Sequence, residues 1–290
     1  MLNYGFAVED NRELDGFCPN EVPIELSLSQ QDPLFAHKIE FWMRGEVLNN
    51  KSNTKRVRVC VSNNENTRLL FSLLRAMNCN AEELKAITSP VAGEMRSLFV
   101  PEHRNVTSFY RSCRDIRHPL SLRNERAVML NLLQLISHAL ARYPSSLNQD
   151  KSDLLDERAY PPYSNKRHAK IQVRGEKEVL HHFARWARTA MDVMDVIEQD
   201  LKEEQQRGVE VQLGRGVVSE DNSRSCGYDY IIRRMEEDEV GVHHTILRYC
   251  ADVLGSLRRE EFKNLRRQRT PLPTTGYKRG GGGGGEGYIF

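Results

Sequence analysis

The sequence predicts a mainly α-helical fold, a multi-helical bundle with a short strand near its start. Two patterns predict the helices: apolar residues recur every three or four positions through 179–201, and two adjacent apolar stripes run through 124–143. Strict alternation of apolar and polar residues over 22–28 predicts the strand, because successive side chains of a strand point to opposite faces. These patterns establish a fold class and leave the activity open.

The strand is followed by a helix with clear boundaries. Asp32 can cap its first turn, Pro33 suits the first helical position, and Gly45 can end it. The sequence then predicts a β-branched strand and two helices, at 57–61, 67–77 and 81–87. Any sheet is therefore short and lies near the start of the chain.

The second half of the chain is predicted to contain longer helices. The helix at 124–143 ends at Pro144, and a long helix covers about 165–204. Gly175 interrupts the long helix at a cost of ~1 kcal/mol relative to alanine. A last amphipathic helix is predicted from residue 242 onward, because apolar residues again recur at helical spacing.

Charge and cysteine content argue against several classes of protein. The 42 basic and 40 acidic residues leave a formal net charge of +2, which argues against bulk electrostatic binding of nucleic acid. The basic run 258–269 is either a local anion-binding patch or a solvated helix face. Six cysteines without a CxxC pair indicate free buried thiols in a reducing compartment, rather than a zinc cage or a disulfide framework.

The sequence shows neither a membrane segment nor a targeting signal. No apolar run approaches the roughly 20 residues that span a bilayer, and residues 1–10 lack the charged and apolar regions of a signal peptide. We therefore expect an intracellular protein, in the cytoplasm, nucleus or plastid, without a membrane partner. The oligomeric state is left open.

Complete catalytic and metal-binding motifs are absent from the sequence. It contains no GxSxG, HExxH or GxxxxGK[ST] motif, and its GxG at 214–216 lies in a polar stretch rather than at a strand-to-helix turn. Adjacent residues on a helix point in different directions, so we predict surface or half-buried histidines, and no metal site, at His181-His182 and His243-His244. The chain therefore does not read as a self-sufficient enzyme.

Five ordered blocks resemble the C-terminal substrate-binding domain of the Rubisco large-subunit methyltransferase family of SET-domain proteins. The first block resembles the tract that closes the SET core, and the others resemble elements of the helical lobe. The blocks are Asn3-Tyr4-Gly5-Phe6 with Glu9-Asp10-Asn11; 22–28 with Ser29, Asp32, Pro33 and Leu34; LLFSLLRAMNCNAEE at 69–83; Pro119, Ser121, Asn124, Glu125, Leu140, Tyr143, Gln149 and Asp150; and Arg174-Gly175-Glu176-Lys177 with Val179-Leu180.

The resemblance implies methyl transfer from S-adenosyl-L-methionine to a nitrogen of a protein substrate, most often a lysine amine. In the family, the Tyr-Gly-Phe tract supplies part of the aromatic wall near the lysine channel and the cofactor, since ring faces stabilise cationic groups. Carried over, this makes Tyr4 a substrate-binding residue and Phe6 a cofactor-binding residue. The alternative is that both are core aromatics that join two lobes. No catalytic residue and no metal ligand are assigned.

The family's cofactor-binding glycine motif, asparagine-histidine tract and catalytic tyrosine precede the position of Tyr4. We therefore expect a protein-substrate-binding lobe that has no cofactor of its own. One alternative is a truncated part of a complete protein-lysine methyltransferase. Another is a helical scaffold that binds protein, or nucleic acid through 258–269 and Lys278-Arg279.

The expected organisation has five parts, because composition and periodicity change along the chain. The segment after the long helix is polar and glycine-rich, and the C-terminal end contains six consecutive glycines. The flanking basic residues, Arg123, Arg126, Arg174 and Lys177, are predicted to form surface ion pairs. The parts are a remnant of the SET core at 1–20, the helical substrate-binding-like domain at 21–205, a linker at 206–241, an additional helix at 242–268 and a disordered tail at 269–290.

Overall fold

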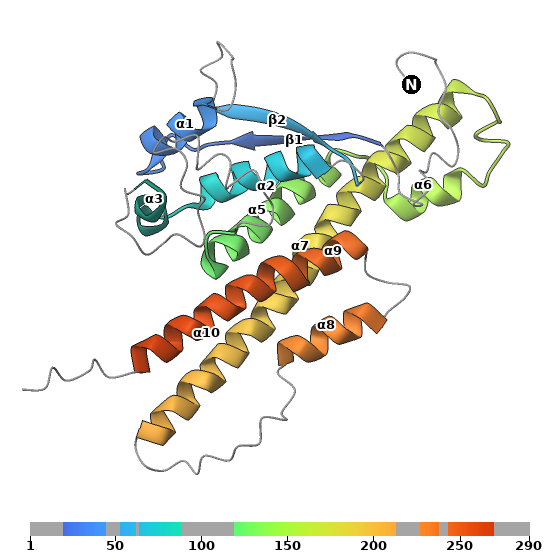
Figure 1. The fold of residues 1–290 in the computed structure, drawn as a ribbon. Helices are drawn as coiled ribbons and strands as arrows, with labels where there is room; N and C mark the ends of the chain where they lie inside the picture. The colour runs from blue at the N-terminus through green and yellow to red at the C-terminus, as the bar shows by residue number, and fades with distance from the viewer. Residues whose placement is uncertain are drawn as a thin grey trace, which may run out of the picture.

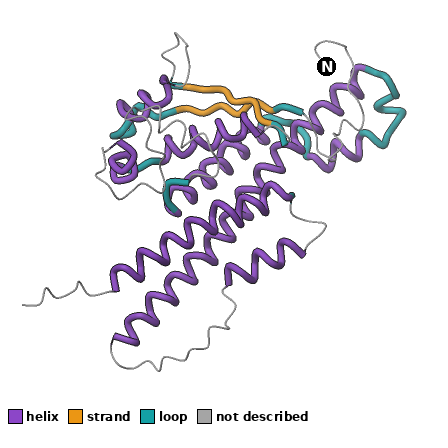
Figure 2. Tube along the Cα trace, viewed as in Figure 1, coloured by secondary structure: helices purple, strands orange, loops and turns teal. Residues whose placement is uncertain are grey.

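A computed structural model describes six stretches of the chain: 20–44, 53–61, 64–88, 119–212, 227–237 and 243–269. The predicted remnant of the SET core and the predicted glycine-rich tail lie almost entirely outside these stretches. Within them, the fold is mainly helical, with one small sheet (Figures 1 and 2). This confirms the predicted fold class.

The sheet consists of two antiparallel strands, β1 (Val22–Ser27) and β2 (Thr54–Val59), with Val22 opposite Val59. Along β1 and into Leu28, the apolar side chains are buried and the side chains between them are exposed, as the alternating pattern predicts. The sheet lies over helices α2 and α5 in Figure 1. One face of the sheet therefore belongs to the core, and the other faces solvent.

Three helices accompany the sheet: α1 (Phe35–Arg44), α2 (Asn64–Asn78) and α3 (Ala81–Thr88). The capping role of Asp32 is confirmed, because its Oδ1 accepts the backbone N–H of Leu34 at 2.8 Å. Its Oδ2 also accepts a hydrogen bond from the buried Lys38, at 2.7 Å. Burial acts to raise the pKa of Asp32, but the bonds from Lys38 and Leu34 outweigh it and lower the pKa. Gly45, the predicted end of α1, lies outside the described residues.

The next three helices are α5 (Leu122–Ala141), α6 (Leu147–Asp153) and α7 (Asn165–Gln212). Helices α5 and α7 pack against each other, and α6 lies beside the N-terminal part of α7 (Figure 1). Ser121 caps α5 by accepting the N–H of Asn124. Helix α7 continues past the predicted end at residue 204, because the charged residues there are good helix formers and the helix face is solvated. Helices α2, α5 and α7 form layers that pack against the sheet (Figure 1).

Helix α8 (Gly227–Glu237) shows that the prediction of a linker over 206–241 was wrong for this part of the segment. Apolar residues at helical spacing within it form a stripe that packs on the core: Tyr228, Ile231, Ile232 and Met235. The polar and glycine-rich residues before this stripe favour the prediction of a linker. A short apolar stripe is a weak signal until a partner surface is known.

The last segment comprises α9 (His244–Arg248), a π-helical turn η1 (Tyr249–Leu254) and α10 (Gly255–Arg269). The hydroxyl of Tyr228 donates to the carbonyls of Cys250 and Ala251 in this turn, at 2.9 and 3.2 Å. Burial raises the pKa of Tyr228 to about 12, so the hydroxyl keeps its proton. A Cβ on Gly255 would lie 2.5 Å from the same hydroxyl, which explains the glycine.

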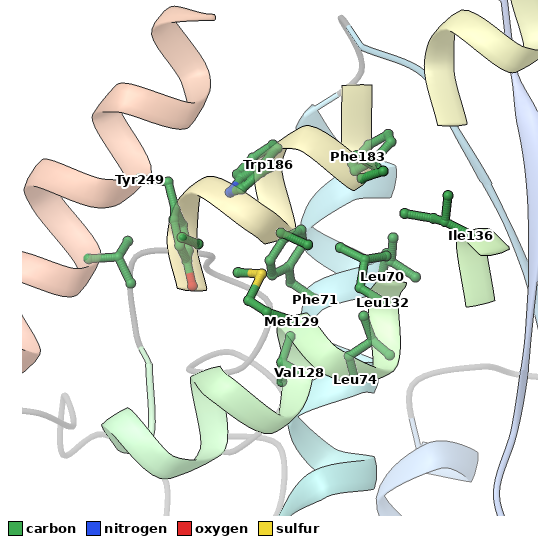
Figure 3. Close-up of a cluster of buried hydrophobic side chains, with 14 of the residues drawn as sticks. Leu70, Phe71, Leu74, Val128, Met129, Leu132, Ile136, Phe183, Trp186 and Tyr249 are labelled. Carbon is green, nitrogen blue, oxygen red and sulfur yellow. The ribbon is translucent and has the colours of Figure 1, made fainter. Parts of the chain in front are cut away.

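One continuous hydrophobic core includes residues from the strands, from α2, α5 and α7, and from the C-terminal helices. At its centre, the rings of Phe71, Trp186 and Tyr249 lie within 5.2–5.9 Å of one another, centroid to centroid (Figure 3). The predicted additional helix is therefore packed on the same core as the predicted helical domain. No helix in the described stretches combines the length and apolarity that a membrane crossing requires.

Candidate functional site

The two residues that the resemblance singles out, Tyr4 and Phe6, lie outside the described residues. Their roles at the substrate and the cofactor stay predictions. Among the described residues, no group of three or more histidine, cysteine, aspartate or glutamate side chains is arranged to hold a metal ion. The candidate site is therefore built from the other motif blocks, and we follow each of these blocks into the structure.

The block around Asn124 and Glu125 joins α5 to α2 through a buried ion pair. Arg75 and Glu125 are fully buried, and two hydrogen bonds of 2.5 and 3.1 Å connect the guanidinium to the carboxylate. The side chain of Asn124 donates to the backbone carbonyl of Arg75 at 3.2 Å. Bidentate pairing of this kind fixes both distance and orientation. It therefore sets how α2 and α5 pack.

Tyr249 extends this ion pair into the C-terminal helices. Its hydroxyl donates to Oε2 of Glu125 at 2.5 Å, across 124 positions of sequence. Burial raises the pKa of Tyr249 well above its ordinary value, and the charge of Glu125 raises it further, so the phenol acts as a donor. We call Arg75, Glu125 and Tyr249 the first polar cluster. It connects α2, α5 and η1.

The acidic turn after α2 forms a second contact with the start of α5. The Glu83 carboxylate accepts hydrogen bonds from the hydroxyl of Ser121 and from the guanidinium of Arg123. It also accepts the N–H of Asn80, whose side chain accepts the N–H of Glu83 in return, which is a capping box. Burial acts to raise the pKa of Glu83, but the bonds from Arg123, Ser121 and Asn80 lower it overall.

The blocks around Asp150 and Lys177 meet in another buried ion pair. Lys177 is 1% exposed, and its Nζ lies 2.5 Å from Oδ2 of Asp150 and 2.6 Å from the carbonyl of Ser145. Lys170 adds a second ammonium, 2.9 Å from Oδ1 of Asp150. We call Asp150, Lys170 and Lys177 the second polar cluster. The prediction that Lys177 forms a surface ion pair was wrong, because the pair is buried between α6 and α7.

Electrostatics keep the Asp150 carboxylate ionised. Burial acts to raise its pKa, but hydrogen bonds from Lys177, Ser145 and Lys170 lower the pKa overall. Beside it, the hydroxyl of Tyr143 donates to the carboxylate of Glu176 at 2.8 Å. The tyrosine and the glutamate-lysine pair of the motif blocks thus hold the loop after α5 against α7.

The other three flanking cations also form ion pairs, and those of Arg123 and Arg126 reach the surface, as the sequence predicts, whereas the pair of Arg174 is largely buried. Arg126 pairs with Asp195 and Glu198 on α7, at 2.6 and 2.9 Å. Arg123 is half-exposed and pairs with Glu83, and Arg174 pairs with Glu178 one turn on, at 3.9 Å. The exposed pairs of Arg123 and Arg126 add at most about 1 kcal/mol each to the free energy of unfolding. They therefore contribute little to the stability of the fold.

The structure also places the basic run of α10 and the two histidine doublets. Arg258 is half-buried, 3.7 Å from Asp200, and lies over the rings of Tyr228 and Phe262. The basic residues after it, Arg259, Lys263, Arg266 and Arg267, are exposed. His182 and His243 are half-buried, as predicted, and their rings lie 4.6 Å apart, centroid to centroid. The sequence analysis did not foresee this contact between the two doublets.

The sequence contains a signal for the burial of Lys177 and Glu125, because each charged residue lies on an apolar helical row. Lys177 lies on the same helical row as Leu180 and Ala184, and Glu125 lies on the row of Val128 and Leu132. A charged residue on an apolar row is buried only when a partner of opposite charge reaches it. The sequence shows the row but does not show the partner.

The motif blocks within the described residues form a packed framework of paired buried charges. Their buried charges are neutralised by one another. The first cluster joins elements that are distant in sequence, and the second joins the successive helices α6 and α7. The largest exposed apolar side chains in the described stretches lie outside both clusters, at Leu130, Leu155, Tyr163 and Tyr230. Of these residues, the two tyrosines are of the type that most often anchors protein contacts.

Comparisons with known proteins agree with the motif blocks. The family model "Rubisco LSMT substrate-binding" matches residues 29–180. A solved structure described as the SET domain of LSMT bound to lysine and AdoHcy is 17% identical over 67% of this chain and 37% of its own length, with a TM-score of 0.47. A structure of Rubisco LSMT bound to AdoMet is 17% identical over 61% of this chain and 35% of its own, with a TM-score of 0.42.

This chain thus spans little more than a third of the length of these solved proteins. Comparison with curated proteins gives no match. The family model covers slightly more than half of the 290 residues, and it includes β2, Arg75, Glu125, Asp150 and Lys177. The chain therefore belongs to the Rubisco LSMT substrate-binding family.

Proposed function

We propose that this chain holds a protein substrate for a SET-domain, S-adenosylmethionine-dependent protein-lysine N-methyltransferase and does not itself transfer the methyl group. One observation carries the proposal: the residues of the family motif blocks form buried structural clusters, not a set of reactive groups. A lobe of this kind contributes to catalysis by placing a protein beside a reactive centre.

A rigid framework suits this role for a physical reason. Ordering a flexible surface on binding costs about 0.5–1.5 kcal/mol for each immobilised side chain, and a surface that is already ordered avoids much of this cost. The first polar cluster fixes α2 and α5, and the second fixes α6 and α7. The backbone positions that carry the exposed side chains of these helices are therefore set before a partner binds.

The buried carboxylates among the described residues support a lobe without a cofactor of its own. Glu125 and Asp150 are fully buried and already bind basic side chains of this chain, so neither offers an acceptor to the ribose of S-adenosylmethionine. When bound in a complete enzyme of this family, the cofactor would supply the methyl group from its sulfonium. The proposed contacts of Tyr4 with the substrate and of Phe6 with the cofactor belong to that complete enzyme.

A photo-cross-linking experiment tests the binding role. Benzoylphenylalanine replaces Leu130, Tyr163 or Tyr230 in the full chain, and Glu25, on the exposed face of the sheet, is the matched control. We expect benzoylphenylalanine at one or more of the three apolar positions, and not at Glu25, to cross-link a protein. Mass spectrometry should identify a methylated lysine in that protein. Excess unlabelled chain should compete with the capture.

Two outcomes would contradict the proposed function. In one, none of the three positions captures a protein that carries methyl-lysine. In the other, cross-links form chiefly to nucleic acid, which would favour the basic face of α10 as the binding surface. The exposed basic residues of α10 are interspersed with Glu260 and Glu261, and this mixture of charge does not favour phosphate binding.

A further inference from the structure

The exposed surface of α7 between residues 179 and 191 consists of basic side chains. Three residues of this stretch are exposed, His181, Arg185 and Arg188, and the others are buried or half-buried. The stretch contains no aspartate or glutamate. The three positions are spaced as i, i+4 and i+7, so they form one row along the helix. At about 1.5 Å of rise per residue, the row is roughly 10 Å long.

Helix α6, which packs beside α7, adds a cation to this row. Lys151 on α6 is exposed, and its positive charge acts on the imidazole of His181. Burial lowers the pKa of His181, and neighbouring positive charges lower it further: those of Arg188, Lys151, Lys177 and Arg185, in decreasing order. Lys177 is buried in the second polar cluster. We call the exposed residues Lys151, His181, Arg185 and Arg188 the basic patch.

The lysine and the last arginine of the basic patch differ from the flanking cations, which pair with acids. Arg126 and Arg174 each contact a carboxylate of α7. Lys151 and Arg188, in contrast, form no ion pair within the stretches that the structure describes. Like charges one turn apart destabilise a helix, so the row on α7 lowers the stability of the helix rather than raising it.

We propose that the basic patch binds an acidic segment of the protein that this lobe holds. This binding role rests on the proposed function and extends it, since it states the chemistry of the partner at one surface. An arginine guanidinium binds a carboxylate through two parallel hydrogen bonds, which gives geometric specificity as well as attraction. Complementary charge also accelerates the encounter of two proteins. The excess of positive charge therefore suits a partner that carries carboxylates.

The size of the basic patch favours a peptide segment over nucleic acid. Proteins with strongly salt-dependent binding to DNA make on the order of 6–10 phosphate contacts. The basic patch carries permanent charges at only three positions, Lys151, Arg185 and Arg188. An extended peptide places alternate side chains on one side, roughly 7 Å apart, so about two or three carboxylates match the length of the row.

Fluorescence anisotropy on the full chain, with a labelled peptide of alternating glutamate and serine, tests the basic patch. We expect saturable binding that weakens as the ionic strength rises toward about 0.15 M, where the screening length is roughly 8 Å. A peptide of the same length with glutamine in place of glutamate should not bind.

Charge reversal identifies the residues that bind the peptide. Arg188→Glu on α7 and Lys151→Glu on α6 should each weaken the binding by roughly tenfold, because each turns an attraction into a repulsion. Arg267→Glu is the matched control, since it makes the same change of charge on α10, and its effect should stay below about twofold. All three positions are exposed, so the variants should unfold at the urea concentration of the wild type.

The basic patch is not a site for acidic peptides if the glutamate peptide does not bind, or if Arg267→Glu weakens its binding as much as Arg188→Glu does. A single-stranded oligonucleotide of equal charge that binds more tightly than the peptide, and loses this affinity in Arg188→Glu, would also overturn the proposal. The cross-linking experiment separates these failures from that of the proposed function. Capture of a methyl-lysine protein without peptide binding would overturn the role of the basic patch alone.

Discussion

Replacing Glu125 by alanine is expected to lower the free energy of unfolding by about 3–5 kcal/mol, measured by urea denaturation. The physical reason is that Arg75 would remain buried without its carboxylate, and an uncompensated buried charge is strongly unfavourable. The variant also removes the acceptor of the Tyr249 hydroxyl, so the packing of η1 should weaken together with that of α2 and α5.

Two control variants separate the charge from the volume of the side chain. Arg75→Met combined with Glu125→Leu removes both charges and should cost clearly less than Glu125→Ala alone, because no charge is left unpaired. Tyr249→Phe removes one hydrogen bond to a charged acceptor and should cost about 1.5–3 kcal/mol. If Glu125→Ala proves no worse than the double variant, the first polar cluster is not a determinant of stability.

Replacing Lys177 by methionine is expected to cost about 3 kcal/mol. The length of the side chain is kept, but the buried carboxylate of Asp150 loses its 2.5 Å partner. The value lies at the lower end of the range for buried pairs, because Lys170 still contacts Asp150. Lys170→Met is the matched control; its side chain is 15% exposed, and the cost should be about 1 kcal/mol.

The pH dependence of this effect has a defined sign. Since the folded-state pKa of Asp150 is lowered below the ordinary value of 3.8, its contribution is present above that value and is lost as the pH falls below it. The difference between the wild type and Lys177→Met in urea denaturation should therefore shrink at the lowest pH. A difference that does not change with pH would indicate that packing, not the ion pair, explains the cost.

Periodicity alone predicts the elements that bury one face along their whole length. The alternation in β1 and the long apolar stripe of α7 are both confirmed, because one face of each element is buried along its length. The helices of the family blocks are confirmed for the same reason. The resemblance adds the family, and the match over residues 29–180 confirms it.

The sequence does not predict contacts that depend on partners far along the chain. The bond between Tyr249 and Glu125 spans 124 positions, and nothing local to either residue indicates it. The sequence predicts a surface ion pair for Lys177, and only the position of Asp150 on α6 explains why the pair is buried. Helix α8 is not predicted for a similar reason, since its apolar stripe gains stability from packing on α7 and α9 rather than from its own sequence.

Calorimetric titration of the purified chain with S-adenosylmethionine tests most directly whether this lobe binds proteins without binding the cofactor. We expect no heat of binding, because the buried charged groups of the described helices pair with one another. Saturable binding with a dissociation constant of about 1–100 μM, which corresponds to roughly 5–8 kcal/mol, would contradict it.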